Sequence, residues 1–341
     1  MPTTRLLLPS ITGVICRFTR SLAVLTVITL ASTAQAQPGE VVDDAGRTVM
    51  VPGDPSRVFS GGDFAFTQIL AELDIPIIGS IASYDRTTGQ SFVHGFANTR
   101  GEYLEDTAAA LFTDQVVPSI EDLAALEPDL IIAPLFGGQD ILHQLEVVAP
   151  TYLVGHSTAP WVMYESIARA VHRTEAYERR RAIFEERLEL TRERLGVPAG
   201  TTYALVTIEA TGALSPHDLP TYTHILEGLG LEPNPLMREM RTLRTYAPLS
   251  YERFTDLEAD FIFAPFRERS YKLLGQAADN LNRNLPMWCH LLEACRDGRM
   301  IFFSEDVALS GTFTALNSFL EIAQSHLATR FIPGGPGVGE P

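Results

Sequence analysis

The 341-residue sequence is poor in positive charge, and above all in lysine. It has 26 basic residues against 42 acidic ones, a formal net charge of −16 at pH 7, and only one lysine, Lys272. A protein that binds nucleic acid or adheres to anionic lipid needs a basic surface, so this balance argues against both classes. Nearly all fixed positive charges are arginines, and the places where they gather are therefore informative.

The common signatures of enzyme active sites are missing as well. The chain has no G-x-S-x-G nucleophile elbow, no H-E-x-x-H zinc motif and no G-x-x-x-x-G-K-[ST] phosphate loop. Its eight histidines are scattered, without acidic or cysteine partners at metal-ligand spacing. These absences predict a protein that is not an enzyme and needs no cofactor or resident metal.

Long hydrophobic runs are absent too. The apolar stretch Leu22–Ala31 is too short for a membrane span, which needs about 20 residues. It follows three arginines and precedes the small-x-small pattern Ala34–Ala36, so we expect residues 1–36 to be an export signal that is cleaved near Ala36. Cys16 lies before the apolar stretch, which argues against a lipid anchor, and the mature protein is expected in the periplasm.

One segment occurs twice in the chain. Ser119–Pro134 reads S-I-E-D-L-A-A-L-E-P-D-L-I-I-A-P and Ser250–Pro265 reads S-Y-E-R-F-T-D-L-E-A-D-F-I-F-A-P, with eight of sixteen positions identical. The copies lie 131 residues apart, whereas the repeats of a solenoid span about 20–50 residues. The repeat therefore predicts two similar domains in one chain.

Each copy is predicted to form a short helix, a turn and a buried strand. Ser119 and Ser250 suit a helix N-cap. Glu121 and Glu252 then fall in the first helical turn, where the helix dipole favours an acidic side chain. The unbroken apolar runs L-I-I-A and F-I-F-A are typical of parallel strands that are covered on both faces. The predicted fold is α/β, with two lobes that each contain a mainly parallel sheet flanked by helices.

A stretch without glycine or proline connects the two lobes. Residues 161–195 carry apolar side chains at helical spacing and end at Gly196, which predicts a single helix of about 50 Å. Before the first repeat, Tyr84–Asp114 has no sustained periodicity and is expected to be a long irregular loop. The predicted organisation is a signal peptide at 1–36, an N-terminal lobe at 37–158, the connecting helix at 159–196, a C-terminal lobe at 197–331 and a disordered tail at 332–341.

Two cysteines, Cys289 and Cys295, remain in the mature chain. An oxidising compartment favours a disulfide between them. Six residues along an unbroken helix separate the Cα atoms by about 9 Å, which is beyond the roughly 7 Å that a disulfide tolerates. The bond therefore requires the helix to end between the two cysteines, and two reduced thiols are the alternative.

Three segments stand in a recognisable order: D-A-G-R-T-V-M-V-P…P-S-R-V at Asp44–Val58, P-S-I-E-D-L-A-A-L-E-P-D-L-I-I at Pro118–Ile132 and P-M-W-C-H-L-L-E-A-C-R-D-G-R-M-I-F-F at Pro286–Phe303. Their order and spacing resemble those of the class III substrate-binding proteins of ABC importers, over nearly the whole mature chain. The resemblance implies a carrier of ferric siderophore, cobalamin or haem that holds its ligand in a shallow cleft between the lobes. It also implies that each lobe offers a surface carboxylate to arginines of the permease.

By position, these docking carboxylates are Glu121 and Glu252. The alternative is that both only stabilise helix N-termini, by about 0.3–1 kcal/mol each. Their recurrence at the same place in both lobes favours docking.

The ligand is expected at the carboxyl ends of the strands, where open α/β sheets bind their ligands. Arginines flank the second repeat on both sides, and guanidinium groups pair with carboxylate or catecholate oxygens and stack on aromatic rings. We expect Arg241, Arg244 and Arg267 to neutralise an anionic ferric chelate, and aromatic residues to pack against its organic part. The predicted ligand-binding residues are Phe64, Tyr84, Arg86, Phe136, Arg241, Arg244, Tyr246, Arg267, Arg269 and Tyr271. The alternative for each single arginine is a surface ion pair.

The predicted function is a monomeric periplasmic protein that binds a ferric siderophore and delivers it to an ABC permease, with no nucleic-acid partner. Many hydroxamate-binding members of this class place an arginine just before the first repeat, where this chain has L-F-T-D-Q-V-V-P-S without one. This departure argues against a hydroxamate ligand, unless Arg86 or Arg100 from the segment 84–114 takes that place. Haem is an alternative ligand, because Tyr and Arg can bind iron and propionates. Uncharged cobalamin explains the arginines less well, and a periplasmic enzyme acting on an iron chelate is the alternative of another class.

Overall fold

The computed structural model describes residues 37–85, 89–113, 118–155, 161–209, 211–216, 218–243, 248–266, 274–308 and 310–332. The expected signal at 1–36 and nearly all of the expected tail lie outside these ranges. No helix within the described ranges combines the length and apolar character of a membrane span.

The first lobe is built on a five-stranded sheet in the order β7-β4-β3-β8-β9, with all neighbours parallel. Its strands are β3 (Val58–Ser60), β4 (Ile77–Ile81), β7 (Ala110–Phe112), β8 (Leu130–Pro134) and β9 (Thr151–Val154). The chain begins in the middle at β3, builds outward to β7, and then starts again on the other side at β8. Ligands of open α/β sheets bind beside such a change of direction, here at the carboxyl ends of β3 and β8.

Helices cover both faces of this sheet, as the alternation of side chains along each strand requires. Leu130 and Ile132 of β8 pack into one cluster of buried side chains together with Ile69 and Ile167 from the helices on that face. Ile131 and Ala133 point the other way, into a cluster with the helices on the second face. The helical segments are η1 (Asp63–Thr67), α1 (Gln68–Glu72), α3 (Ile120–Ala125), α4 (Leu135–Gly138), η3 (Gln139–Ile141), α5 (Leu142–Val148) and α6 (Val162–Ala170).

The expected irregular loop at 84–114 is instead largely ordered into short elements, so that prediction was wrong. These are β5 (Ser83–Asp85), β6 (Gln90–Phe92), α2 (Phe96–Arg100), η2 (Leu104–Asp106) and β7, which completes the first sheet. Gly95 and Gly101 stand at the two ends of α2 with φ of 64° and 77°. Elements of three to five residues are too short to display a periodicity. Gly95 and Gly101 therefore indicated the ends of a short helix and not an irregular loop.

The connecting segment contains two helices, α6 and α7 (Thr174–Leu195), and not one continuous helix from Trp161. The long helix expected between the lobes is α7, with 22 residues. His172 has a φ of 53°, Arg173 N–H donates to the Ala168 carbonyl at 2.7 Å, and the helix α6 therefore closes in a Schellman motif. This left-handed position usually holds glycine, and because His172 occupies it here, the break between the helices could not be predicted.

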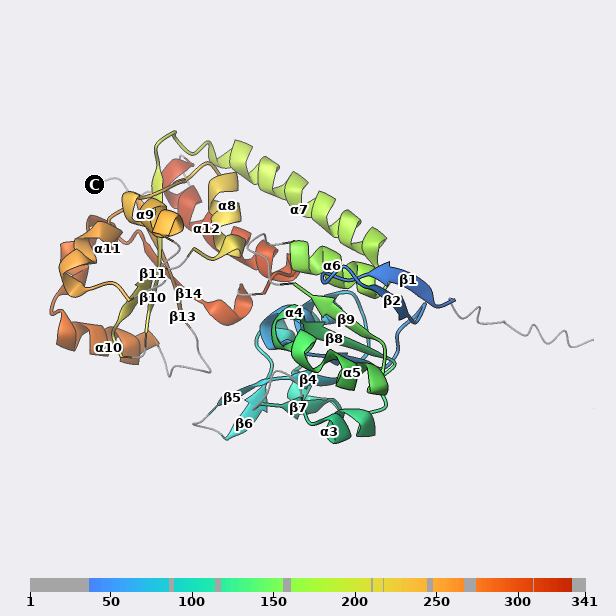
Figure 1. Ribbon diagram of the computed structural model, residues 1–341. Coiled ribbons are helices and arrows are strands. Elements are labelled where there is room, and N and C mark those ends of the chain that lie inside the picture. Colours follow the sequence, from blue (N-terminus) through green and yellow to red (C-terminus); the bar gives the residue numbers. More distant parts are fainter. Residues whose placement is uncertain are drawn as a thin grey trace, which may run out of the picture. The chain divides into compact units, whose positions relative to one another are not determined.

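The second lobe contains a mixed sheet in the order β11-β10-β13-β14, with β12 also paired to β10. Its strands are β10 (Thr202–Ile208), β11 (Leu214–Pro216), β12 (Glu232–Pro233), β13 (Phe261–Phe266) and β14 (Met300–Ser304). Only β11 runs antiparallel to its neighbour. The predicted α/β class, with a mainly parallel sheet in each lobe, is therefore confirmed (Figure 1).

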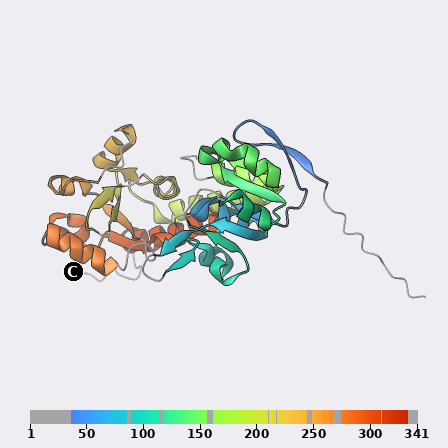
Figure 2. The same ribbon diagram turned by 60° about the horizontal axis from the view of Figure 1, so that its bottom comes forward.

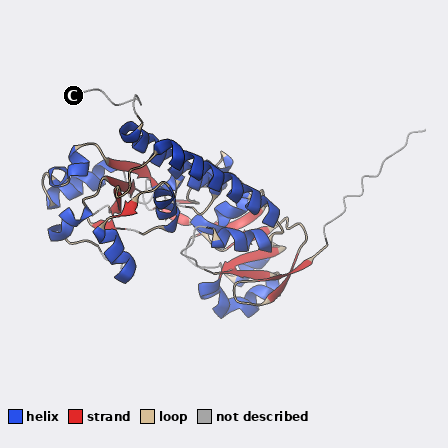
Figure 3. Ribbon diagram, turned by 90° about the horizontal axis from the view of Figure 1, so that it is seen from above, coloured by secondary structure: helices blue, strands red, loops and turns tan. Residues whose placement is uncertain are grey.

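The helices of the second lobe surround this sheet, as Figure 3 shows for both lobes. They are α8 (Pro220–Gly228), α9 (Pro235–Leu243), η4 (Tyr251–Leu257), α10 (Leu274–Asn284), η5 (Trp288–Leu291), α11 (Glu293–Arg296), η6 (Glu305–Val307) and α12 (Phe313–Phe331). At the start of the described chain, β1 (Gly39–Val42) and β2 (Thr48–Val51) form an antiparallel hairpin that is a sheet of its own (Figure 2).

Helix α12 also contacts the first lobe through its first turn. The backbone N–H groups of Phe313 and Thr314 donate to the buried carboxylate of Glu72 in α1, at 2.9 and 2.7 Å. The Phe313 ring packs against Tyr164 and three further aromatic side chains of the connecting segment. Burial, followed by the negative charge of Glu72, raises the pKa of Tyr164. The two lobes thus share a buried contact in addition to the connecting helices.

Candidate functional site

The aspartate of the repeat has the same structural role in both lobes. Asp129 accepts hydrogen bonds from the Ser56 N–H (2.7 Å), the Ser56 hydroxyl (2.9 Å) and the Arg57 N–H (3.0 Å), just before β3. Asp260 accepts from the N–H and hydroxyl of Thr202 at 2.7 and 2.9 Å, at the start of β10. In each lobe this side chain fixes the beginning of the neighbouring parallel strand.

The helix of the repeat differs between the lobes. Ser119 is the N-cap of α3, as predicted, and its hydroxyl oxygen accepts the Asp122 N–H at 3.1 Å. Ser250 makes no such cap, and the expected second α-helix is the 3₁₀-helix η4. The buried residues of η4, Phe254 and Leu257, are three positions apart. A helix with three residues per turn places both on one line toward the core.

Glu121 and Glu252 remain exposed on these helices. Within the described ranges neither carboxylate forms an ion pair. The pKa of Glu252 is lowered by a hydrogen bond from its own backbone N–H and by one from the Ser250 hydroxyl. Both carboxylates therefore offer negative charge to solvent at matching places in the two lobes.

The structure joins Cys289 and Cys295 by a disulfide, with a Cα–Cα distance of 5.2 Å. Cys289 lies in η5 and Cys295 in α11, and the extended residue Leu292 separates the two helices. The helix thus ends between the cysteines, which is the condition that the spacing imposed. The repeat supports this turn as well, because Glu258 accepts the first backbone N–H groups of α11 at 2.6 and 3.0 Å.

The ligand edge predicted for the first lobe presents exposed aromatic side chains. Phe136 follows β8 and is 91% exposed, and Tyr84 in β5, which follows β4, is 52% exposed. Phe64 lies in η1, directly after β3. Phe136 and Tyr84 thus both leave aromatic surface open to solvent, on segments that follow strands of the first sheet.

A buried cluster of polar side chains, which was not predicted from the sequence, lies at the carboxyl end of β3. Asp63 accepts hydrogen bonds from the Ser83 hydroxyl (2.6 Å) and the His94 N–H (2.9 Å), and its carboxylate lies 2.8 Å from Nδ1 of His94. The cluster ties the end of β3 to the β5–β6 hairpin, which carries Tyr84. Asp63 and His94 are 31 positions apart, so no local pattern signalled their contact.

On the second lobe, the structure describes only one of the predicted ligand-binding residues. Arg241 of α9 donates to Asp218 (2.8 Å), to Glu227 (2.6 Å) and to the Tyr203 hydroxyl (2.9 Å). Its charge is thus compensated within the lobe, which favours the alternative of an ion pair over ligand contact. Outside the described residues lie Arg86, Arg244, Tyr246, Arg267, Arg269 and Tyr271.

The described residues contain no group of three His, Cys, Asp or Glu side chains that could hold a metal ion. A family model described as periplasmic binding protein matches residues 93–307, which is more than half of the chain. The chain belongs to the periplasmic binding protein family. The family consists of binding proteins and not of enzymes.

Two curated relatives resemble this periplasmic binding protein in sequence. The ferric enterobactin-binding periplasmic protein FepB of Escherichia coli O6:H1 is 27% identical over 199 residues, which are 55% of this chain and 60% of FepB. The probable siderophore-binding lipoprotein YfiY of Bacillus subtilis is 24% identical over 262 residues, which are 71% of this chain and 75% of YfiY. The match to FepB therefore spans less than two thirds of that protein.

Solved structures share the fold of this periplasmic binding protein over most of its length. Staphylococcus aureus SirA, complexed with staphyloferrin B, has a TM-score of 0.66 at 16% identity, covering 85% of this chain and 98% of SirA. Bacillus subtilis FeuA, complexed with ferri-bacillibactin, has a TM-score of 0.65 at 18% identity, with the same coverage of both chains. At such identities the likeness concerns the fold.

Proposed function

We propose that the protein binds an anionic ferric siderophore in the periplasm and delivers it to an ABC permease of the inner membrane. The observation that carries the proposal is Phe136, which stands 91% exposed at the carboxyl end of β8, where the fold predicts a ligand. The names of FepB and YfiY and the ligands of SirA and FeuA support the ligand class. Export requires that residues 1–36 act as a signal cleaved near Ala36.

The proposed ligand contacts combine aromatic packing with positive charge. Phe64, Tyr84 and Phe136 supply the aromatic surface of the first lobe, together with Arg86. Arg241 is left out of the set, because its guanidinium already binds two carboxylates. The contacts proposed for the second lobe are Arg244, Tyr246, Arg267, Arg269 and Tyr271.

Intrinsic fluorescence titration of the mature protein tests this function. The panel comprises ferric catecholate, carboxylate and hydroxamate siderophores, haem and cobalamin. We expect saturable binding of an anionic ferric siderophore without turnover, and weaker binding by Phe136→Ala and by Arg244→Ala/Arg267→Ala. Val42→Ala, at a 53% exposed position on β1, serves as the control. Preferred binding of haem or cobalamin, or conversion of the chelate, would overturn the proposal.

We further propose that Glu121 and Glu252 pair with arginines of the permease. Both are exposed and form no ion pair among the described residues, whereas Asp129 and Asp260 of the repeat each hold the backbone of a neighbouring strand. The variant Glu121→Arg/Glu252→Arg should bind the ferric siderophore normally and lose its uptake in cells. Full uptake by this variant would refute the docking role and leave ligand binding untouched.

A further inference from the structure

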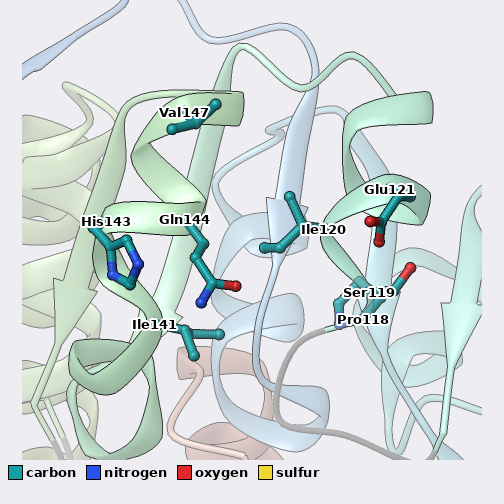
Figure 4. A pocket seen from close by; sticks show the side chains of 8 residues that line it. All are labelled: Pro118, Ser119, Ile120, Glu121, Ile141, His143, Gln144 and Val147. Atoms are coloured by element: carbon teal, nitrogen blue, oxygen red, sulfur yellow. The ribbon is translucent and has the colours of Figure 1, made fainter.

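Beside Glu121 the first lobe has a groove between α3 and α5. Its volume is about 570 Å³, and its apolar lining consists of Pro118, Ile120, Ile141 and Val147. Figure 4 shows Ile120 of α3 and Gln144 of α5 on facing sides of the groove, with Glu121 next to Ile120 on α3. A carboxylate and an apolar hollow are thus adjacent on one surface.

This surface has no covering within the described part of the chain. Val147 is 84% exposed, and Glu121 is exposed without an ion pair among the described residues. Burial of the valine and neutralisation of the carboxylate both favour association. The complementary surface therefore presents a cation beside a bulky apolar side chain.

The groove lies on the side of the first lobe where the ligand is proposed to bind. Helix α3 leads into β8 and α5 follows it, so the first residues of both helices lie toward the carboxyl end of β8. Phe136 follows that same strand end. A partner seated in the groove is therefore close to the proposed ligand edge.

The second lobe offers a different surface beside its carboxylate. Arg253, next to Glu252, forms ion pairs with Glu239 of α9 and with Asp256, both at 2.8 Å. Among the described residues of η4 and α9, the neighbouring surface is thus an ion-paired one. The two carboxylates are alike, but their surroundings are not.

We propose that the groove between α3 and α5 binds a bulky apolar side chain of the ABC permease, beside the permease arginine that pairs with Glu121. This inference rests on the proposed docking function. The first lobe then docks through a carboxylate and an apolar hollow, and the second lobe through its carboxylate alone. The first lobe carries the larger share of the docking affinity.

The test measures binding of the mature, siderophore-loaded protein to the permease–ATPase complex that imports the same chelate, held in nanodiscs. Val147→Ser should weaken this binding by about fivefold, as expected when one apolar side chain is lost from an interface, without changing its salt dependence. Glu121→Gln should weaken the binding and also reduce its salt dependence. Val42→Ser is the matched control, because Val42 is a 53% exposed valine of the same lobe, on β1.

The outcomes separate this inference from the docking proposal. The groove has no role in docking if Val147→Ser, Val42→Ser and the unchanged protein bind the permease equally well while Glu121→Gln binds more weakly. That result would leave docking through the carboxylate intact. If Glu121→Gln and Glu252→Gln bind the permease as tightly as the unchanged protein, the docking proposal itself is wrong. Siderophore affinity and the thermal unfolding midpoint, which all four exposed substitutions should leave unchanged, verify that each variant is folded.

Discussion

At the scale of single residues, the repeat contains two kinds of identical position. Asp129 and Asp260 are explained by the fold, because each holds the backbone of the next strand. Glu121 and Glu252 are exposed, and no ion pair within the described ranges explains them. Identity within a repeat therefore reflects shared folding requirements at one position and, we propose, a shared partner at another.

This division predicts stability effects of different size for two acids of the first repeat. Asp129→Ala removes the acceptor for three hydrogen bonds and should lower the free energy of unfolding by about 1–2 kcal/mol. Glu121→Ala should change it by less than about 0.5 kcal/mol, as is usual for an exposed side chain. Urea unfolding followed by circular dichroism measures both, and equal losses would contradict the assignment.

A second prediction concerns the charge of Glu252. Its pKa lies below the ordinary value of 4.5 because its own backbone N–H, and then the Ser250 hydroxyl, bind the ionised carboxylate. Ser250→Ala removes the second donor and should raise the pKa part of the way back, as an NMR pH titration of the side chain would record. A depressed pKa keeps the carboxylate charged from neutral into weakly acid solution. An unchanged titration curve in Ser250→Ala would show that the hydroxyl has no such role.

At the scale of elements, buried strands were predicted well and helix ends less well. The strands expected at the apolar runs L-I-I-A (130–133) and F-I-F-A (261–264) lie within β8 and β13. Continuous apolar runs define such strands, because both faces are buried. The break between α6 and α7 was missed because His172, and not a glycine, occupies its left-handed position. A left-handed backbone conformation at a residue other than glycine cannot be recognised from the amino-acid sequence.

The left-handed position between α6 and α7 yields a prediction with an internal control. His172→Ala and His172→Gly both remove the imidazole, but only glycine adopts a φ of 53° without steric cost. His172→Gly should therefore be more stable than His172→Ala by about 1 kcal/mol in urea unfolding. Equal stabilities would mean that the connection relaxes to another conformation when the ring is absent.

At the scale of the whole molecule, the sequence predicted organisation better than it predicted the site. The repeat occurs once in each half of the chain, and a segment without glycine or proline lies between the copies. The two lobes could be inferred from these two features. Whether a predicted ligand-binding side chain is open to a ligand depends on partners that are distant in sequence. Arg241 illustrates this, because Asp218 and Glu227 are 23 and 14 positions away. An arginine count cannot tell a compensated guanidinium from one that is open to a ligand.

The contact between the lobes through Glu72 was not predicted from the sequence, and a substitution of Glu72 tests its role. Glu72 of α1 accepts the N–H groups of Phe313 and Thr314 and the Thr314 hydroxyl, the last at 2.6 Å, so one buried carboxylate joins the first lobe to α12. Glu72→Gln keeps the size of the side chain but replaces one acceptor oxygen by an NH₂ group. One buried N–H then lacks its acceptor, at a cost of about 1–3 kcal/mol.

The matched control is Glu321→Gln, which alters an exposed acid of α12 that pairs with Arg187 and should cost less than about 1 kcal/mol. Siderophore affinity distinguishes the two possible roles of Glu72. If the contact fixes how the lobes present the ligand edge, Glu72→Gln weakens binding while Asp129→Ala, of similar stability, does not. If both variants bind equally well, Glu72 serves stability alone. Among the described residues, Glu72 is the acceptor of the Phe313 N–H. If Glu72→Gln is as stable as the unchanged protein, the carboxylate is not needed to hold α12 against the first lobe.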